Sequence, residues 1–433
     1  MTDLGIDSKT ATKEATTIFL VAILIGAICG LATFLFVAAD HLGVSFLWDE
    51  LPHLVPGVPS WAVGLAVVAV FTILATAVVA ICGKRPFDVG GADAEYNKDG
   101  RMEYRQLLAG AAFSLLSLFS GAAVGPEAPL TDINGGLGTF VAERIGLKPD
   151  QVKVLTYAGV AGAFSAFFGA APIGALLAAE LISPMSETLN RTVIVSGLAS
   201  GATGWVVYES LGGQKIPLLL QFSNVTSPSL WQLGVAVLLG LLGAVLGLAY
   251  GAAFMKSRLA LQPLRKRPWL AALAGGTLIA VASVVSPFLL FSGQGQVAQA
   301  ISQATALGAL VLIALGVGKL VLSIGSLSTA YFGGPIFPLI FSGVCFGLAV
   351  SLIIPGIPQG LAVMAVLAGM VSAATVAPLS ITIFLALMTN PELISVIAIA
   401  AVAAFIVRQA VAPTLPGVYR ATRAAEHRAA RKS

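Results

Sequence analysis

The sequence predicts an all-α, polytopic membrane protein whose tilted, broken helices form two halves of inverted topology. Three observations lead to this fold class. Of the 433 residues, 57% are hydrophobic and only 10% are charged. Long stretches contain no Asp, Glu, Lys or Arg. Two short motifs recur in the same order in the two parts of the chain, which is typical of transporters built from internal repeats.

The composition excludes several classes of protein. An ordinary soluble domain carries about 25% charged residues, whereas this chain carries 10% and has a mean hydropathy of +0.94. There are too few polar residues to cover a water-soluble fold, so a soluble enzyme, a nucleic-acid-binding protein and a secreted disulfide scaffold are excluded. The three cysteines and three histidines share no ligand-like spacing. We therefore expect no metal and no organic cofactor.

The membrane-spanning segments are predicted from charge-free runs. A spanning helix needs about 20 apolar residues, and its backbone must be hydrogen-bonded internally. The runs do not alternate in polarity as the strands of a membrane barrel would, so helices are predicted. The runs cover residues 15–39, 51–83, 106–126, 154–179, 216–255, 268–318 and 320–391.

The distribution of basic residues predicts the orientation. Five Lys and Arg residues crowd the loop 256–267, and five more lie in the C-terminal tail. Short loops rich in these residues stay on the cytoplasmic side, so we place that loop and the C-terminus inside a cell (inner) membrane. The predicted organisation is a cytoplasmic segment (1–14), a first repeat (15–210), an inter-repeat segment (211–230), a second repeat (231–415) and a basic tail (416–433).

The repeat is visible in two pairs of motifs. Residues 125–130 read GPEAPL, and residues 334–339 read GPIFPL. After each copy comes an Ala-Gly pair and then an Ala-Pro pair, at 161–172 in the first half and at 368–378 in the second. The chain also contains 47 Gly and 22 Pro residues, which favours broken helices. Broken helices at matching positions of two halves indicate an ion site between them.

Both GPxxPL copies predict a helix start. Proline is favoured in the first turn of a helix, where the missing N–H costs nothing. The remaining N–H groups of that turn and the positive end of the helix dipole attract anions. The prolines and glycines of the two copies would therefore build an anion site without a fixed positive side chain. They are Gly125, Pro126, Pro129, Gly334 and Pro338.

Glu127 is the candidate gate. It follows 21 residues without a charge, and an ionisable residue at such a depth is by default a functional hypothesis. Its carboxylate is itself an anion beside the predicted site, so it could occupy the site when ionised and leave it when protonated. The alternative is a structural Glu that caps an interfacial helix.

From about Ala15 to Tyr419 the chain resembles the CLC family of chloride channels and chloride/proton exchangers. GPEAP is similar to the family's Gly-Arg/Lys-Glu-Gly-Pro segment, with Glu127 at the gating position. The segment from Gly334 to Pro338 resembles the family's Gly-x-Phe-x-Pro. Leu415–Tyr419 resembles the segment that carries an anion-coordinating tyrosine, and Lys319 stands where the family often has a basic residue.

The resemblance implies roles for several residues. The amides of Ile336 and Phe337 and the hydroxyl of Tyr419 would ligate a chloride or similar anion, with protons as the second substrate. The family's Gly-Ser-Gly-Ile-Pro segment falls near residues 90–95, where Ala92 or Asp93 replaces the serine. An ionised Asp93 would repel an anion, so the anion preference stays open, with fluoride as an alternative to chloride.

The internal proton path also stays open. Many exchangers carry a proton-transferring glutamate as the second of an adjacent pair; here Glu180 matches the first, and Leu181 replaces the second. Exchange of anion against protons and a passive, voltage- or pH-gated channel are therefore both considered. A membrane-embedded enzyme would need clusters of catalytic residues that the sequence lacks.

The resemblance also implies a homodimer in the lipid bilayer. Gly197 and Gly201 form a GxxxG pattern, which allows close helix packing either within one chain or between two. Because the family's subunit interface lies in this region, we expect the pair at the dimer contact.

Overall fold

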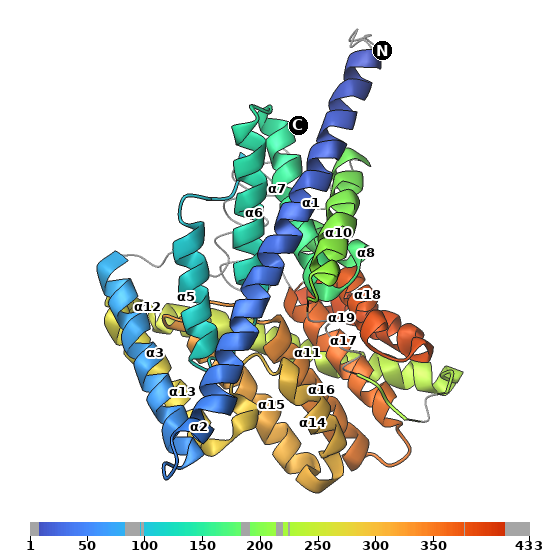
Figure 1. The fold of residues 1–433 in the computed structure, drawn as a ribbon. Helices are drawn as coiled ribbons and strands as arrows, with labels where there is room; N and C mark the ends of the chain where they lie inside the picture. Colours follow the sequence, from blue (N-terminus) through green and yellow to red (C-terminus); the bar gives the residue numbers. More distant parts are fainter. Residues whose placement is uncertain are drawn as a thin grey trace. The chain divides into compact units, whose positions relative to one another are not determined.

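The computed structural model describes residues 8–82, 96, 99–182, 191–213, 220–223, 226–375 and 377–411. Throughout these residues the regular structure is helical, apart from two isolated bridges, Gly125–Gly334 and Leu220–Thr389 (Figure 1). The predicted all-α fold is confirmed. Two groups of predicted site residues, Ala92 with Asp93 and Tyr419, lie outside the described residues.

The helices are given in chain order. In the first part of the chain they are α1 (Ser8–Ser45), a π-helical turn (Phe46–Glu50), α2 (Leu51–Leu54), α3 (Ser60–Cys82), α5 (Leu107–Phe119), α6 (Glu127–Arg144), α7 (Pro149–Phe168), α8 (Ala171–Ile182) and α10 (Arg191–Ser210). In the second part they are α11 (Leu230–Ala260), α12 (Gln262–Arg265), α13 (Pro268–Val285), α14 (Val297–Ser302), α15 (Ala304–Ser328), α16 (Ile336–Ile353), α17 (Gln359–Thr375), α18 (Pro378–Met388) and α19 (Ile394–Val411). Three short 3-10 helices cover Pro287–Leu289, Gln294–Gln296 and Pro391–Leu393.

Seven helical stretches among the described residues are long and apolar enough to cross a membrane. These runs carry almost no charge, as crossing the apolar interior of a bilayer requires. The chain is therefore a multi-pass membrane protein. The seven stretches are Glu14–Leu54, Ser60–Val78, Leu230–Ala260, Pro268–Val285, Ala304–Ser328, Ile336–Ile353 and Pro391–Val411.

By its internal contacts the chain divides into two compact units. Unit 1 contains Met1–Leu42, Pro86–Ala112 and Pro126–Ile216; unit 2 contains Gly43–Arg85, Phe113–Gly125 and Pro217–Ser433. These units are defined by contacts rather than by the motifs. The predicted repeat boundaries stay a prediction.

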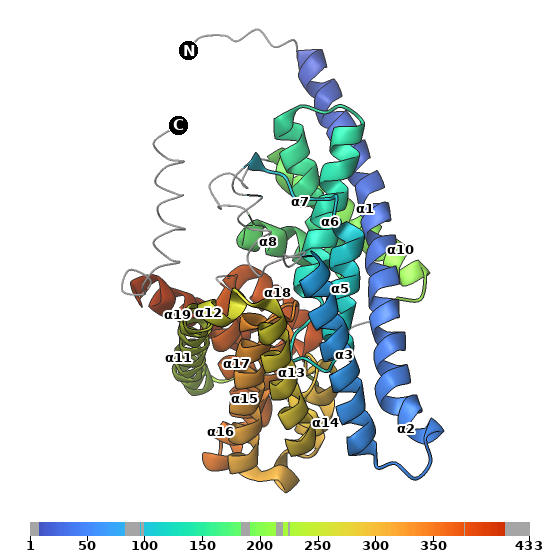
Figure 2. The same ribbon diagram turned by 90° about the vertical axis from the view of Figure 1, so that its left-hand side faces the viewer.

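In unit 1, α6 and α7 lie side by side, as both views show (Figures 1 and 2). The turn between them is closed by Gly146, whose φ of 74° suits glycine, and the N–H of Leu147 donates to Ala142 O at 3.2 Å. Helix α10 packs against α7 through small residues. A Cβ on Gly197 would meet the Tyr157 ring at 2.6 Å, and one on Gly201 would meet Ser165 Oγ at 2.4 Å.

This packing corrects the expectation for the GxxxG pair. Both glycines face α7 of the same chain, so the pair serves packing within unit 1. A Cβ at either position would require the Tyr157 ring or the Ser165 side chain to move, so glycine allows α10 to lie close to α7. The predicted homodimer draws no support from these two residues.

In unit 2, α11, α17 and α19 pack against one another, and α16 packs on both α15 and α17. The orange helices α15, α16 and α17 can be followed in Figure 2. Gly369 of α17 lies so close to Gly240 of α11 that an added Cβ would fall 2.1 Å from the Gly240 carbonyl oxygen. Nearly all of α16 and α17 is buried, so these two helices form the core of the unit.

Candidate functional site

The two motif glycines are paired directly. Within unit 2, Gly125 N donates to Gly334 O and Gly334 N donates to Gly125 O, both at 2.7 Å. A Cβ on the neighbouring Gly333 would meet Val124 Cβ at 2.6 Å and Gly125 O at 2.8 Å. The backbone approach therefore requires glycine. The structure brings these two parts of the repeated motif together although they are 209 residues apart.

Each copy of the motif opens a helix, as the sequence predicts. Helix α16 begins at Ile336, directly after Pro335, and Leu339 N donates to Pro335 O at 3.0 Å. The first N–H groups of any α-helix have no carbonyl partner within the helix. The first turn of α16 contains the N–H groups of Ile336 and Phe337, whereas Pro338 has none. Both residues are buried, at 5% and 1% exposure, so their amides belong to the protein interior.

Helix α6 begins at Glu127, directly after Pro126, and belongs to unit 1. The Glu127 side chain is only 3% exposed. Thr131 Oγ1 donates to Glu127 O at 2.9 Å within the first turn. A carboxylate at this end of a helix is stabilised by the helix dipole, so the position suits an ionised glutamate better than a helix interior would. Pro129 completes the first turn of α6 and is buried.

The body of α6 is unusually polar for a buried helix. Asn134 Nδ2 donates to Thr33 Oγ1 at 3.3 Å and to Leu130 O at 2.8 Å, and Cys29 Sγ contacts Asn134 O at 3.8 Å. Asp132 is 8% exposed. These contacts fix α6 against α1 and so set the direction of the turn that carries Glu127.

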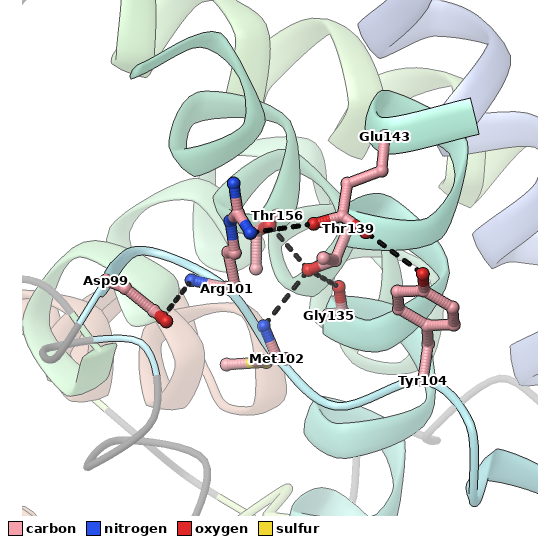
Figure 3. A network of polar contacts seen from close by, with 8 residues as sticks. All are labelled: Asp99, Arg101, Met102, Tyr104, Gly135, Thr139, Glu143 and Thr156. Atoms are coloured by element: carbon pink, nitrogen blue, oxygen red, sulfur yellow. Dashed lines mark hydrogen bonds and ion pairs between the residues drawn. The ribbon is translucent and has the colours of Figure 1, made fainter. Parts of the chain in front are cut away.

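A polar network holds the far half of α6 (Figure 3). Met102 N donates to Thr139 Oγ1 at 3.1 Å, and Thr139 Oγ1 lies 2.7 Å from Thr156 Oγ1 of α7. Arg101 pairs with Glu143 at 3.2 Å, and Tyr104 donates to the same carboxylate at 3.0 Å. The segment 99–105 thus lies along α6. Sequence reasoning missed it, because no local pattern links it to Thr139 or Glu143.

Glu180 lies on α8, a helix different from that of Glu127, and is half-buried. Helix α8 is anchored on α7, since Tyr157 OH donates to Ala175 O at 2.6 Å and Ser165 Oγ donates to Ala171 O at 2.9 Å. The proposed proton role of Glu180 stays a prediction.

The structure also reveals a buried cation that the motifs alone do not assign to a site. Lys319 of α15 is fully buried, and its Nζ donates to the carbonyl oxygens of Leu290 at 2.6 Å and Phe291 at 3.1 Å. Its Nζ lies 4.8 Å from the centroid of the Phe341 ring of α16. In the sequence, Lys319 could have been singled out as the one charged residue between two long charge-free runs, 268–318 and 320–391.

A protein-family model covers most of the chain. The model described as voltage gated chloride channel matches residues 88–409, which is 322 of the 433 residues. The match includes both motif copies, Glu180 and Lys319. It ends before Tyr419.

Curated relatives of the chain are also anion channels and exchangers. The chain is 25% identical over 314 residues to a chloride/fluoride channel protein of Pseudomonas syringae pv. tomato, covering 68% of this chain and 64% of the relative. It is 25% identical over 246 residues to the H(+)/Cl(−) exchange transporter ClcA of Vibrio cholerae serotype O1, covering 55% and 51%. The aligned part of the chain spans between about half and two thirds of these relatives.

Solved structures share the fold. A slow cyanobacterial Cl−/H+ antiporter superposes with a TM-score of 0.77 at 19% identity, covering 95% of this chain and 98% of the antiporter. A CLC-type fluoride/proton antiporter superposes with a TM-score of 0.71 at 15% identity, covering 91% and 95%. These similarities show that the chain shares the fold of these solved structures.

Proposed function

The chain belongs to the voltage-gated chloride channel family, and on that premise we propose that it moves a small monovalent anion, chloride, across a membrane in exchange for protons. The observation that carries the proposal is Glu127, a buried carboxylate at the first position of a helix. A titratable anion in such a position can compete with a transported anion and can carry a proton. The exchange transporter among the relatives supports the same activity.

The anion would be held by backbone amides. The first turn of α16 offers the N–H groups of Ile336 and Phe337 at the positive end of the helix dipole. Tyr419 would add a hydroxyl, and Ala92 or Asp93 would stand in the remaining segment. Amides bind an anion without the strong attraction of a direct ion pair, and an ion must also be released quickly to be transported.

Glu127 would act as the gate. When ionised, its carboxylate stands at the positive end of the α6 dipole, where it would exclude the anion. Protonation removes the charge and lets the side chain leave. Protonation from one side of the membrane and release of the proton on the other would then couple anion movement to proton movement.

A passive anion channel, for chloride or fluoride, is the second candidate. Leu181 stands where many exchangers carry their internal proton-transferring glutamate, and one relative is a chloride/fluoride channel. Leucine cannot relay protons, so coupling would have to use Glu180 or water. The half-buried position of Glu180 on α8 is compatible with such a role.

We further place the protein in the cell (inner) membrane, with the basic loop 256–267 and the C-terminus in the cytoplasm. We expect a homodimer in the lipid bilayer, by similarity to the family. Transport, not enzymatic catalysis, is the activity of the family to which the chain belongs. The buried groups that the proposal uses need no cofactor.

The deciding experiment records two fluxes at once. Purified protein in liposomes is given a chloride gradient, and both chloride efflux and proton uptake are measured. Exchange predicts proton uptake driven by the chloride gradient. Chloride efflux without proton movement between pH 4.5 and 7.5 would instead establish the channel, and the absence of any anion flux would overturn both candidates.

Three variants assign the residues. Glu127→Gln keeps the shape of the side chain but cannot bind or release a proton, so proton uptake should vanish while chloride flux stays measurable. Glu180→Gln should slow proton uptake more than chloride flux. Glu14→Gln is the control, because Glu14 is an exposed acidic residue of the same unit that pairs with Lys148. Undiminished proton uptake in Glu127→Gln would contradict the gating role.

A further inference from the structure

Lys319 is an unusual charge for the interior of a membrane protein. It is 0% exposed, and its ammonium contacts two backbone carbonyls and one aromatic ring. Among the described residues no carboxylate is paired with Lys319, whose ammonium contacts are the two carbonyls and the Phe341 ring. Burying an unpaired charge is costly. Hydrogen bonds from a charged donor are correspondingly strong, so the two carbonyls are held firmly.

The carbonyls that Lys319 holds belong to a strained turn. Phe291 has a φ of 59°, and non-glycine residues rarely occupy this left-handed region. Such conformations persist only where surrounding contacts impose them. Lys319 supplies two of these contacts, and Trp48 supplies a third by placing its ring edge-on to Phe291, with centroids 5.1 Å apart.

The turn at residues 290–291 is hydrogen-bonded to the segment that leads to the first GPxxPL copy. Phe291 N donates to Gly121 O at 2.9 Å, and Trp48 Nε1 donates to Phe119 O at 2.9 Å. Gly121 has a φ of 80°, and a Cβ there would meet the Trp48 ring at 3.1 Å. Glycine at position 121 therefore allows both the left-handed backbone conformation and the close contact with the Trp48 ring.

From Gly121 the contacts continue to the start of α16. Phe332 N donates to Ser117 Oγ at 3.0 Å, and four residues after Gly121 the chain reaches the Gly125–Gly334 pair. Two residues after Gly334, α16 begins. On its other side, Lys319 lies over Phe341, in the second turn of α16. All of these residues belong to unit 2.

We propose that Lys319 is a positioning residue for the anion-binding turn of α16. Its ammonium fixes the carbonyls of residues 290 and 291, which fix the segment 117–125, which is hydrogen-bonded to residues 332 and 334. Because two of its three N–H donors are bonded to carbonyls and its Nζ lies against the Phe341 ring, the charge is engaged within unit 2. The inference rests on the proposed function for its transport readout, and it adds a residue to which the motifs assign no such task.

The experiment compares three variants in chloride binding by calorimetry. Lys319→Met keeps nearly the length of the side chain without donors or charge, and chloride affinity should fall about tenfold, a coupling of the size found between residues of one hydrogen-bond network. Lys319→Arg keeps charge and donors and should stay within about threefold of the wild type. Arg408→Met is the control, because Arg408 is a buried cation of α19 in the same unit.

Trp48 gives a second readout that a change in overall stability would not produce. The chain has five tryptophans, and the other four can be replaced by Phe to leave Trp48 as the reporter of the turn; each is at least 36% exposed: Trp61, Trp205, Trp231 and Trp269. In the folded protein, Lys319→Met should shift the emission of Trp48, whereas Lys319→Arg and Arg408→Met should not.

The outcomes separate this inference from the proposed function. A wild type that binds no chloride would contradict the proposed function, and the Trp48 emission would still test the positioning. A folded Lys319→Met protein with unchanged chloride affinity, or with unchanged Trp48 emission, would overturn the role of Lys319. If Lys319→Met does not fold, Gly121→Ala perturbs the next link with Lys319 in place. It should weaken chloride binding in the same direction, and unchanged binding would overturn the proposal.

Discussion

Helices α6 and α16 open with the same motif but differ in what they bury. The first residue of α6 is Glu127, and the first of α16 is Ile336. Further along, α6 buries Thr131, Asp132, Asn134 and Thr139, whereas the buried residues of α16 are apolar apart from Ser342 and two glycines. The comparison shows that both copies have the same helix start, whereas only the start of α6 has a titratable side chain.

The packing behind the two helices is similar. A Cβ on Gly138 of α6 would meet Leu155 O of α7 at 2.5 Å, and one on Gly347 of α16 would meet Val363 Cα of α17 at 2.4 Å. The two glycines occupy the same position in their helices, 209 residues apart. Backbone contact of this kind requires glycine. The packing that the two helices share therefore depends on these glycines and not on the functional residues.

The largest effect is expected from giving α16 the acidic residue of α6. Ile336→Glu would place a carboxylate at the amides proposed to bind the anion, where the helix dipole stabilises it. Chloride flux in liposomes should be lost at neutral pH and recover partly as acidification protonates the carboxylate, toward its ordinary pKa of about 4.3.

Ile336→Gln is the matched control, because it has the same shape without the charge. It should retain chloride flux at all pH values. If Ile336→Glu conducts chloride at neutral pH as well as Ile336→Gln does, the first turn of α16 is not on the anion path and the contrast between the two helices loses its functional meaning.

The contrast also shows how far a sequence can be interpreted. The starts of α6 and α16 were predicted because the preferences of Gly and Pro are local and act within one turn. The fold class followed from charge-free runs that have no other stable form in a membrane. These features depend on neighbours in the sequence, so they can be recognised without a structure.

The features that were missed depend on tertiary contacts. The partners of Lys319 are backbone carbonyls 28 and 29 residues away, and carbonyls have no sequence signature. The GxxxG pair was assigned to a dimer contact, but a pattern of small residues does not say which helix it faces, and Tyr157 and Ser165 of the same chain are the neighbours. The roles of Ala92, Asp93 and Tyr419 stay predictions.

A second, smaller effect is expected from the glycines of the repeated Ala-Gly pair. A Cβ on Gly369 would meet backbone atoms of Gly240, 2.1 Å from its oxygen, whereas one on Gly162 would first meet the side-chain Oγ of Ser200 at 2.7 Å. Backbone cannot move aside as a side chain can. Gly369→Ala should therefore lower the free energy of unfolding by about 3 kcal/mol, near the upper end of overpacking effects.

Gly162→Ala should cost less, about 1 kcal/mol, because Ser200 can rotate away and lose its 2.6 Å hydrogen bond to Ala158 O. Unfolding in a series of detergent mixtures measures both variants against the wild type. Equal losses, or a larger loss for Gly162→Ala, would mean that the two halves are packed with the same tolerance and that the distinction between side chain and backbone does not decide the cost.

The smallest effect concerns the polar network of α6, which α16 lacks, since Leu348 and Leu352 stand where α6 has Thr139 and Glu143. The hydrogen bond from Tyr104 to Glu143, together with the negative charge of that carboxylate, raises the pKa of Tyr104 above its usual value. Because the folded-state pKa is raised, the contribution of Tyr104 to stability is fully present below about pH 10 and is lost as the pH rises through the folded-state pKa. The difference in thermal midpoint between wild type and Tyr104→Phe should therefore stay constant to about pH 10 and then shrink. In Glu143→Gln the phenol should titrate closer to its ordinary pKa.

A difference in thermal midpoint between wild type and Tyr104→Phe that persists unchanged at high pH would contradict this. It would show that Tyr104 contributes by packing against Phe140, with ring centroids 5.4 Å apart, instead of by its hydrogen bond.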